Sequence, residues 1–284
     1  MIPRAPTPTE DFARCPIYAR LNREWEPRGA EWTPNMLLGR AIGDGMTQCY
    51  RNTQDPAFWA DDSNDPLQTA LDALQEGFVE QDTWSIEALR KLVTTGLREA
   101  LQTTPVQGTI LMVDESLPSR ARPDVVFRHP SAGLTVVDTK VRFKLDSRYR
   151  EKALAEYETW WQGFHYAWEV GEVLREPVKY IGPHLITLTP KVSGVYHPIE
   201  VTPERVAFWH RQAETVWRQM PASRDPLGNP IDPPPLSTLT PNWFSCHGKY
   251  GRCFAYDACH TCHLDEDRMS ILYQRKRSEG KERL

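Results

Sequence analysis

Hydrophobic residues along the first 105 positions recur with a helical spacing. They return every three or four residues in several segments, and this period predicts amphipathic helices. Asp65-Pro66 and Ser85 stand where two of these helices would begin, and Asp and Ser are common N-cap residues. The predicted helices cover residues 16–25, 35–50, 66–80 and 84–103.

The pattern then changes to short β-branched and aromatic runs, which are typical of strands. Pro130 to Gly133 separates two of these runs and predicts a turn. Strands are expected at 109–115, 124–129 and 134–143, with one or two more at 180–190 and 195–201. Helices are expected at 148–173 and from Thr202-Pro203 to Met220, where proline takes the first helical position.

Together these elements predict an α/β fold, in which a mixed sheet is flanked by helices and preceded by N-terminal helices. Residues 221–241 contain seven prolines, which excludes regular structure and indicates a linker. The predicted regions are an N-terminal helical region at 1–105, a core at 106–220, and a linker with a cysteine-rich, metal-binding tail at 221–284.

Composition limits where the protein acts and how it could bind nucleic acid. No run approaches the roughly 18 apolar residues that a membrane helix needs, and the first residues lack the apolar region of a signal peptide. We therefore expect a soluble, cytoplasmic protein with no membrane partner. Because the formal net charge is −4, any binding of nucleic acid must depend on a local basic patch.

The strand at 134–144 carries the candidate chemistry. Its residues alternate, so that Asp138, Lys140, Arg142 and Lys144 share one face. A hairpin would bring Asp124, at the start of the preceding strand, beside Asp138. Two converging carboxylates repel each other unless a cation lies between them, and hard divalent ions prefer oxygen ligands. The alternative is that these charges merely cover the solvent-facing side of an edge strand.

Several short motifs, in their order and spacing, together resemble those of a known protein family. Pro123-Asp124 followed by Asp138-Thr139-Lys140 resembles the PD-(D/E)xK signature. Gln162 and Tyr166 resemble the Q-x3-Y motif of the RecB/AddB-like exonuclease branch of that superfamily, and Asp114-Glu115 matches an acidic position before its PD motif.

The resemblance implies a restriction-endonuclease-like core and a Mg²⁺- or Mn²⁺-dependent deoxyribonuclease. Asp124, Asp138 and Glu115 would hold the metal, Lys140 would assist attack of water, and Gln162 and Tyr166 would position Lys140 or the DNA. The implied substrate is single-stranded DNA or DNA ends, cut exonucleolytically in recombination, repair or phage metabolism. One position departs from the family pattern: Gly43 takes the place of the usual metal-binding histidine.

A basic run begins at the candidate catalytic strand. Residues 140–152 hold six basic and two acidic side chains, which suits contact with phosphates. We predict DNA binding by Arg142, Lys144, Arg148 and Arg150; a solvated helix face would explain the same charges. The nearby aromatic residues could stack on unpaired bases, although core packing is the usual role of such side chains.

Six cysteines in a reducing compartment favour metal ligands or buried thiols over disulfides. Four of them, Cys246, Cys253, Cys259 and Cys262, lie within 17 residues, which indicates a zinc or iron–sulfur site. Many nucleases of the resembled branch carry an iron–sulfur staple with one N-terminal cysteine. The resemblance therefore implies a [4Fe-4S] cluster on Cys15, Cys246, Cys253 and Cys259, with Cys262 as an alternate ligand and Zn²⁺ as the alternative metal.

Two other functions remain open from the sequence. A catalytically weak DNA-binding or recombination accessory protein would also fit this fold, and Gly43 favours it. A zinc-stabilised interaction module would leave Asp138 and Lys140 as surface charges.

Overall fold

The computed structural model describes residues 33–55, 64–78, 85–144, 157–159, 161–189 and 191–219, together with single residues and short strands elsewhere in the chain. The chain divides into two compact units, Glu31–His210 and Met1–Ala30 with Arg211–Leu284. The predicted linker at 221–241 and the predicted helix at 16–25 lie almost wholly outside the described residues.

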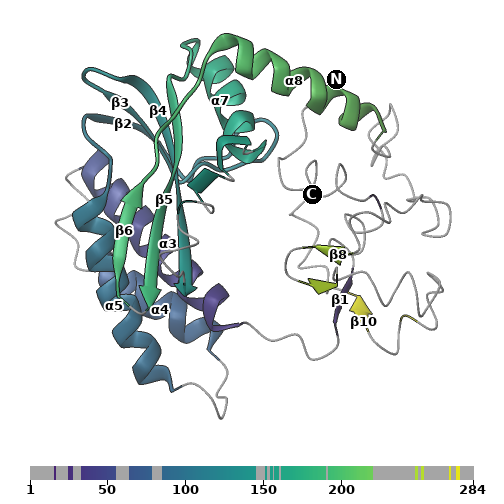
Figure 1. Ribbon diagram of the computed structural model, residues 1–284. Helices are drawn as coiled ribbons and strands as arrows, with labels where there is room; N and C mark the ends of the chain where they lie inside the picture. The colour runs from purple at the N-terminus through teal and green to yellow at the C-terminus, as the bar shows by residue number, and fades with distance from the viewer. Residues whose placement is uncertain are drawn as a thin grey trace. The chain divides into compact units, whose positions relative to one another are not determined.

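The unit Glu31–His210 is built around one mixed sheet (Figure 1). Its strands are β2 (Thr109–Val113), β3 (Val125–His129), β4 (Gly133–Lys144), β5 (Tyr180–Thr189) and β6 (Ser193–Tyr196), in that order, and β7 (Ile199–Glu200) also pairs with β5. Only the β4–β5 pair is parallel. A parallel pair needs a long crossover, and the connection between these strands contains α7 (Trp161–Leu174).

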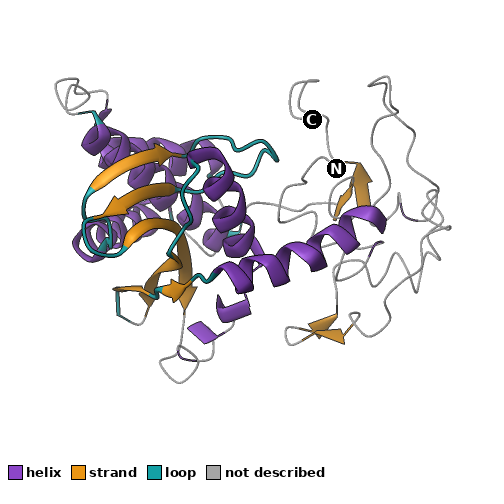
Figure 2. Cartoon of the chain, turned by 90° about the horizontal axis from the view of Figure 1, so that it is seen from above, coloured by secondary structure: helices purple, strands orange, loops and turns teal. Residues whose placement is uncertain are grey.

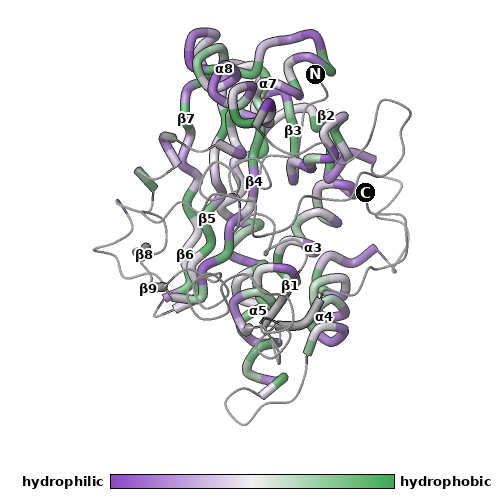
Figure 3. The backbone as a smooth tube through the Cα atoms, turned by 90° about the vertical axis from the view of Figure 1, so that its right-hand side faces the viewer, coloured by the Kyte–Doolittle hydropathy of each residue, from purple (hydrophilic) through white to green (hydrophobic). Residues whose placement is uncertain are grey.

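Two N-terminal helices, α3 (Pro34–Gln54) and α5 (Ile86–Thr103), cover one face of the sheet, and α4 (Pro66–Gly77) packs against both of them. The side chains of Thr33, Asp65 and Ser85 accept hydrogen bonds from amides in the first helical turns, which explains where these helices start. Hydrophobic and polar residues alternate along them (Figure 3), as expected for helices with one buried side.

The main core lies between these helices and the sheet. Ile42, Leu74 and Leu97 pack with Phe127 and Ile186 in one buried cluster. Gly96 allows the close approach, because a Cβ atom there would lie 2.6 Å from Leu188 Cδ2 and 2.7 Å from Ile42 Cδ1. The strands form one layer with helices packed against it (Figure 2).

α7 contacts β4 and β5 and is followed, after β5–β7, by α8 (Pro203–Gln219). The predicted α/β fold with N-terminal helices and a mixed, helix-flanked sheet is thus confirmed. Most boundaries agree within a few residues; within the predicted helix at 148–173, the described residues 151, 154 and 155 are helical, Tyr157–Thr159 forms a 3₁₀ turn, and α7 begins at Trp161. No helix among the described residues is long and apolar enough to cross a membrane.

The unit formed by the two ends of the chain contains two small antiparallel pairs. β1 (Trp25–Pro27) pairs with β10 (Tyr273–Arg275), and β8 (His247–Gly248) pairs with β9 (Gly251–Arg252). A segment near the N-terminus is therefore joined by backbone hydrogen bonds to one near the C-terminus.

Candidate active site

The sheet register places three aspartates in a row across neighbouring strands. Val125 pairs with Val137, so Asp124 stands opposite Asp138 on the next strand. Val113 pairs with Val125, so Asp114 stands opposite Asp124, and the Asp114 amide donates to the Asp124 carbonyl at 3.1 Å. Directly opposite residues of antiparallel strands have Cβ atoms about 5 Å apart. The predicted convergence of Asp124 and Asp138 follows from this register.

The Asp124 carboxyl lies in an environment that strongly disfavours its charge. The backbone amide of Thr139 donates to its Oδ2 atom at 2.5 Å. Burial, and after it the charge of Asp138, raises the pKa of Asp124 to about 7. Near neutral pH a proton or a cation is therefore needed beside this carboxyl to offset the repulsion.

Lys140 follows Asp138 by two residues on the same face of β4. Its ammonium group forms an ion pair with the Asp138 carboxylate and donates to Gln162 Oε1 at 3.3 Å. Burial lowers the pKa of Lys140, but the charge of Asp138, its hydrogen bond with Lys140 and the charges of Asp124 and Tyr157 together outweigh burial, and the pKa is raised. Lys140 is therefore a cation at neutral pH.

Gln162 and Tyr166 lie one turn apart on α7 and join the lysine to the segment before Asp124. Gln162 Nε2 donates to the Tyr166 hydroxyl at 2.6 Å, and this hydroxyl donates to the Arg122 carbonyl at 2.9 Å. Burial raises the pKa of Tyr166, so the hydroxyl keeps its proton and can donate. All five predicted catalytic residues are thus brought to one side of the sheet.

Comparisons with known proteins find only distant similarity. No family model matches the chain, and no curated protein matches it. Among solved structures, a candidate exonuclease from Eubacterium rectale is similar with a TM-score of 0.44 and 16% identity, over 77% of this chain and 80% of that one. The protein SSO0001 is similar with a TM-score of 0.26 and 13% identity, over 63% of this chain and 76% of that one.

The acidic residues before Asp124 are placed differently from one another. Glu115, the predicted metal ligand, is exposed in the loop after β2. Asp114 is half-buried, and its charge helps to raise the pKa of Asp124. The role of Glu115 stays a prediction, and Asp114 is the acidic residue that continues the aspartate row.

Gly43 and Asp44 lie on α3. A Cβ atom at Gly43 would have no heavy atom of the described structure within 4 Å, so a larger side chain would fit there. Burial raises the pKa of Asp44, the Arg40 guanidinium lowers it, and the charge of Asp114 raises it again. This electrostatic effect puts Asp44 in the neighbourhood of the aspartate row.

The predicted DNA-binding residues are only partly described. Arg142 is exposed on β4, and its charge lowers the pKa of Tyr157, which burial raises more strongly. Lys144 ends β4, while Arg148 and Arg150 lie outside the described residues. The basic run therefore stays a prediction beyond Arg142.

The aromatic residues of α7 pack mainly against other parts of the protein. His165 is fully buried and shares hydrogen bonds with Ser119 and Glu169 at 2.9 and 3.1 Å. Trp161 and Trp168 lie against Trp209 of α8, with ring centroids 6.3 Å apart in both pairs. These contacts favour core packing over base stacking for His165 and Trp161.

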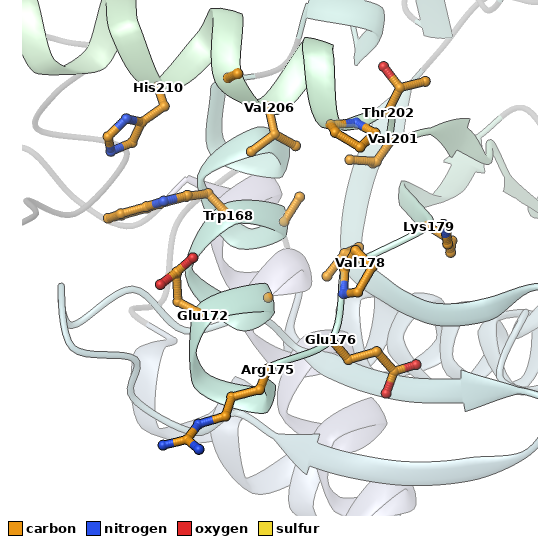
Figure 4. Close-up of a pocket in the computed structure, with 15 residues that line it drawn as sticks. Trp168, Glu172, Arg175, Glu176, Val178, Lys179, Val201, Thr202, Val206 and His210 are labelled. Atoms are coloured by element: carbon orange, nitrogen blue, oxygen red, sulfur yellow. The ribbon is translucent and has the colours of Figure 1, made fainter.

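A cavity of about 630 Å³ opens between the second half of α7, the following loop and the start of α8 (Figure 4). Its lining is mainly apolar, with Val178, Val201 and Val206 among the residues that face it and charged side chains around them. Neither Asp124, Asp138 nor Lys140 lines it. The cavity is thus separate from the candidate catalytic residues.

The predicted cluster ligands Cys15, Cys246, Cys253 and Cys259, and the alternate Cys262, lie outside the described residues, so the iron–sulfur centre stays a prediction. Within the described part of the chain, no group of three or more His, Cys, Asp or Glu side chains is arranged to hold a metal ion unaided. Cys49 is a free, half-buried thiol whose pKa is raised by burial.

Proposed function

We propose that this chain is a metal-dependent DNA nuclease with a PD-(D/E)xK core, in which Asp124, Asp138 and Lys140 act at the reacting phosphate. The observation that carries the proposal is the cross-strand pairing of Asp124 with Asp138, with the Lys140 ammonium on the same face. Charges that merely cover a solvent-facing strand would not explain why the half-buried Asp124 carboxyl beside Asp138 has a pKa of about 7.

The residues present fit a divalent cation. Ionised Asp124 and Asp138 repel each other, and a hard cation that accepts both carboxylates would offset this repulsion. Mg²⁺ is commonly held by one or two carboxylates, with water and substrate phosphate completing its shell, so a third protein side chain is not required. Bound Mg²⁺ or Mn²⁺ would polarise the phosphate and lower the pKa of a bound water.

The protein side chains have separate tasks in this proposal. Because Lys140 is cationic, we assign it the stabilisation of negative charge that develops on the phosphate, rather than the removal of a proton from water. Gln162 holds the Lys140 ammonium in place, and Tyr166 ties Gln162 to the backbone that leads into Asp124. Single-stranded or free-ended DNA as substrate, exonucleolytic cutting and a [4Fe-4S] staple are proposed from the sequence resemblance alone.

End-labelled single- and double-stranded DNA and a closed circular DNA, incubated with Mn²⁺ or Mg²⁺, test the proposal. We expect the linear DNAs to be degraded and the closed circular DNA to stay intact. Lys140→Ala should reduce the rate at least about a hundredfold, since one charge-stabilising donor commonly contributes that much. Lys91→Ala, an exposed lysine of α5, is the matched control and should cut normally. Equal rates for the wild type and Lys140→Ala would remove Lys140 from the reaction.

A DNA-binding accessory protein on the same fold is the second candidate, and Gly43 in place of the resembled histidine favours it. It predicts that the protein binds these DNAs but leaves them intact with either metal.

A further inference from the structure

Two arginines from separate elements converge on Asp114 at the end of the aspartate row. Arg51 Nη2, from α3, lies 3.5 Å from Asp114 Oδ2, and Arg122 Nη1, just before Asp124, lies 3.7 Å from the same oxygen. The Arg51 and Arg122 side chains are 45% and 59% exposed. Two guanidinium groups therefore share one carboxylate oxygen at loose distances, in a place that solvent and ligands reach.

Both arginines are anchored close to the catalytic residues. The Arg122 carbonyl accepts the Tyr166 hydroxyl hydrogen bond at 2.9 Å, and its Nε donates to Ser116 Oγ at 3.0 Å. Arg51 follows Tyr50, a buried residue of α3 whose pKa is raised by burial and further by the charge of Asp124. The two cations thus meet at Asp114, the residue that stands opposite Asp124 in the row.

Asp114 itself has a backbone conformation that is uncommon for a residue with a side chain. Its φ is 49°, in the left-handed region. Its amide is held by the Asp124 carbonyl, so the conformation is tied to the strand pair that forms the site.

We propose that Arg51 and Arg122 form a clamp for a DNA phosphate next to the one that is cut, and that Asp114 occupies the clamp when DNA is absent. This inference rests on the proposed nuclease function. Guanidinium groups bind phosphate oxygens with paired, charge-assisted hydrogen bonds, and the phosphate competes with a carboxylate for the same donors. In a chain of net charge −4 with three aspartates in a row, such local cations would offset the repulsion of a phosphate backbone.

The clamp can be tested by binding without cutting. Fluorescence anisotropy with a labelled single-stranded oligonucleotide in Ca²⁺, over a series of salt concentrations, gives the Kd and its salt dependence. Arg51→Gln and Arg122→Gln should each weaken binding about tenfold and reduce the slope of log K against log salt by about 0.7, the value for one phosphate contact to a single strand. Arg51→Lys and Arg122→Lys should lose less, because they keep the charge but not the paired hydrogen bonds.

Asp114→Asn should change DNA affinity in the opposite direction from the arginine variants, and this distinguishes a phosphate clamp from a metal site. Removing the competing carboxylate should tighten DNA binding several-fold. Mn²⁺ affinity, measured by calorimetry without DNA at pH 8, where Asp124 is ionised in both proteins, should change much less. Arg128→Gln is the matched control, because Arg128 is exposed on β3 and pairs with Glu176. It should bind DNA as the wild type does.

Unchanged affinity and salt slope in both arginine-to-glutamine variants, with wild-type circular dichroism and thermal midpoint, would overturn the clamp. So would an Asp114→Asn variant that loses Mn²⁺ affinity without gaining affinity for DNA. Failure of the nuclease proposal is a separate result, because it is seen as intact DNA after incubation of the wild type with Mn²⁺. The binding measurements do not depend on cleavage.

Discussion

Asp124→Asn should remove activity and at the same time stabilise the fold above neutral pH. Asparagine has nearly the same shape as aspartate and its oxygen can still accept the hydrogen bond from the Thr139 amide, which Asp124 Oδ2 accepts at 2.5 Å. It removes a charge that burial and Asp138 make unfavourable. The substitution therefore removes the unfavourable free energy of the Asp124 charge while keeping the packing of the side chain.

The magnitude follows from the pKa in the two states. The carboxyl titrates near 3.8 when unfolded and at about 7 when folded, so the folded state holds the extra proton between these values. Wild-type stability is therefore lost as pH rises from about 4 to 7, by about 1.4 kcal/mol per pH unit. From pH 5 to pH 8 the asparagine variant should gain about 3 kcal/mol relative to the wild type, since two of these units lie below pH 7.

Urea unfolding followed by tryptophan fluorescence, at pH 5 and pH 8 with EDTA present, measures this difference. The slope of the unfolding free energy against urea concentration should be the same for variant and wild type, so that the shift in midpoint reports stability alone. Asp72→Asn, on the exposed side of α4, removes the same charge and is the control. Other titrating groups contribute equally to both proteins and cancel in the comparison. A difference in unfolding free energy between Asp124→Asn and the wild type that is the same at pH 5 and pH 8 would therefore refute the reasoning.

Three further predictions follow from the same geometry. Mn²⁺ affinity of the wild type should fall about tenfold per pH unit below pH 7, since the metal must displace one proton from Asp124. Calorimetry from pH 5.5 to 8 measures this affinity, and a profile that does not change with pH would contradict the prediction. Tyr166→Phe should lower kcat about tenfold with little change in Mn²⁺ affinity, because it breaks the 2.9 Å bond to the Arg122 carbonyl and leaves the carboxylates in place; wild-type kcat would show that this link is not needed. Gly43→His should fold normally, because the space around Gly43 is open, and it should strengthen Mn²⁺ binding, as the resembled motif implies. Thermal unfolding measures the first effect and calorimetry the second, and unchanged Mn²⁺ affinity would show that this position lies too far from the metal.

The sequence was most informative where the candidate site is formed by neighbours along one hairpin. Alternation on the strand of Asp138 and the short turn before it were enough to predict that Asp124 and Lys140 share a face with Asp138. The spacing of Gln162 and Tyr166 likewise predicts one helix face, and the structure adds the hydrogen bonds that join them to Lys140.

Residues brought in by tertiary packing could not be found in this way. Arg51 belongs to α3, whose approach to the site depends on how the N-terminal helices pack against the sheet, and no local pattern marks it. Arg122 stands two residues before Asp124 and could have been noticed from its position alone. The choice between Asp114 and Glu115 depends on a left-handed backbone at Asp114, which side-chain type does not reveal.

The charges along the aspartate row indicate where a metal would have to bind. Asp138 is neutralised by Lys140 at one end, and Asp114 is neutralised by Arg51 and Arg122 at the other. Asp124 stands between them; among the described residues no cationic side chain forms an ion pair with it, and its pKa is raised to about 7. A cation would therefore be most favourable beside Asp124, within reach of Asp138, and in the proposed clamp the arginines at the far end would meet the phosphate. Lys140 has a related role in this row. Its ammonium group, held by Asp138 and Gln162, balances the charge of Asp138; a neutral lysine would leave Asp138 as well as Asp124 without an opposite charge.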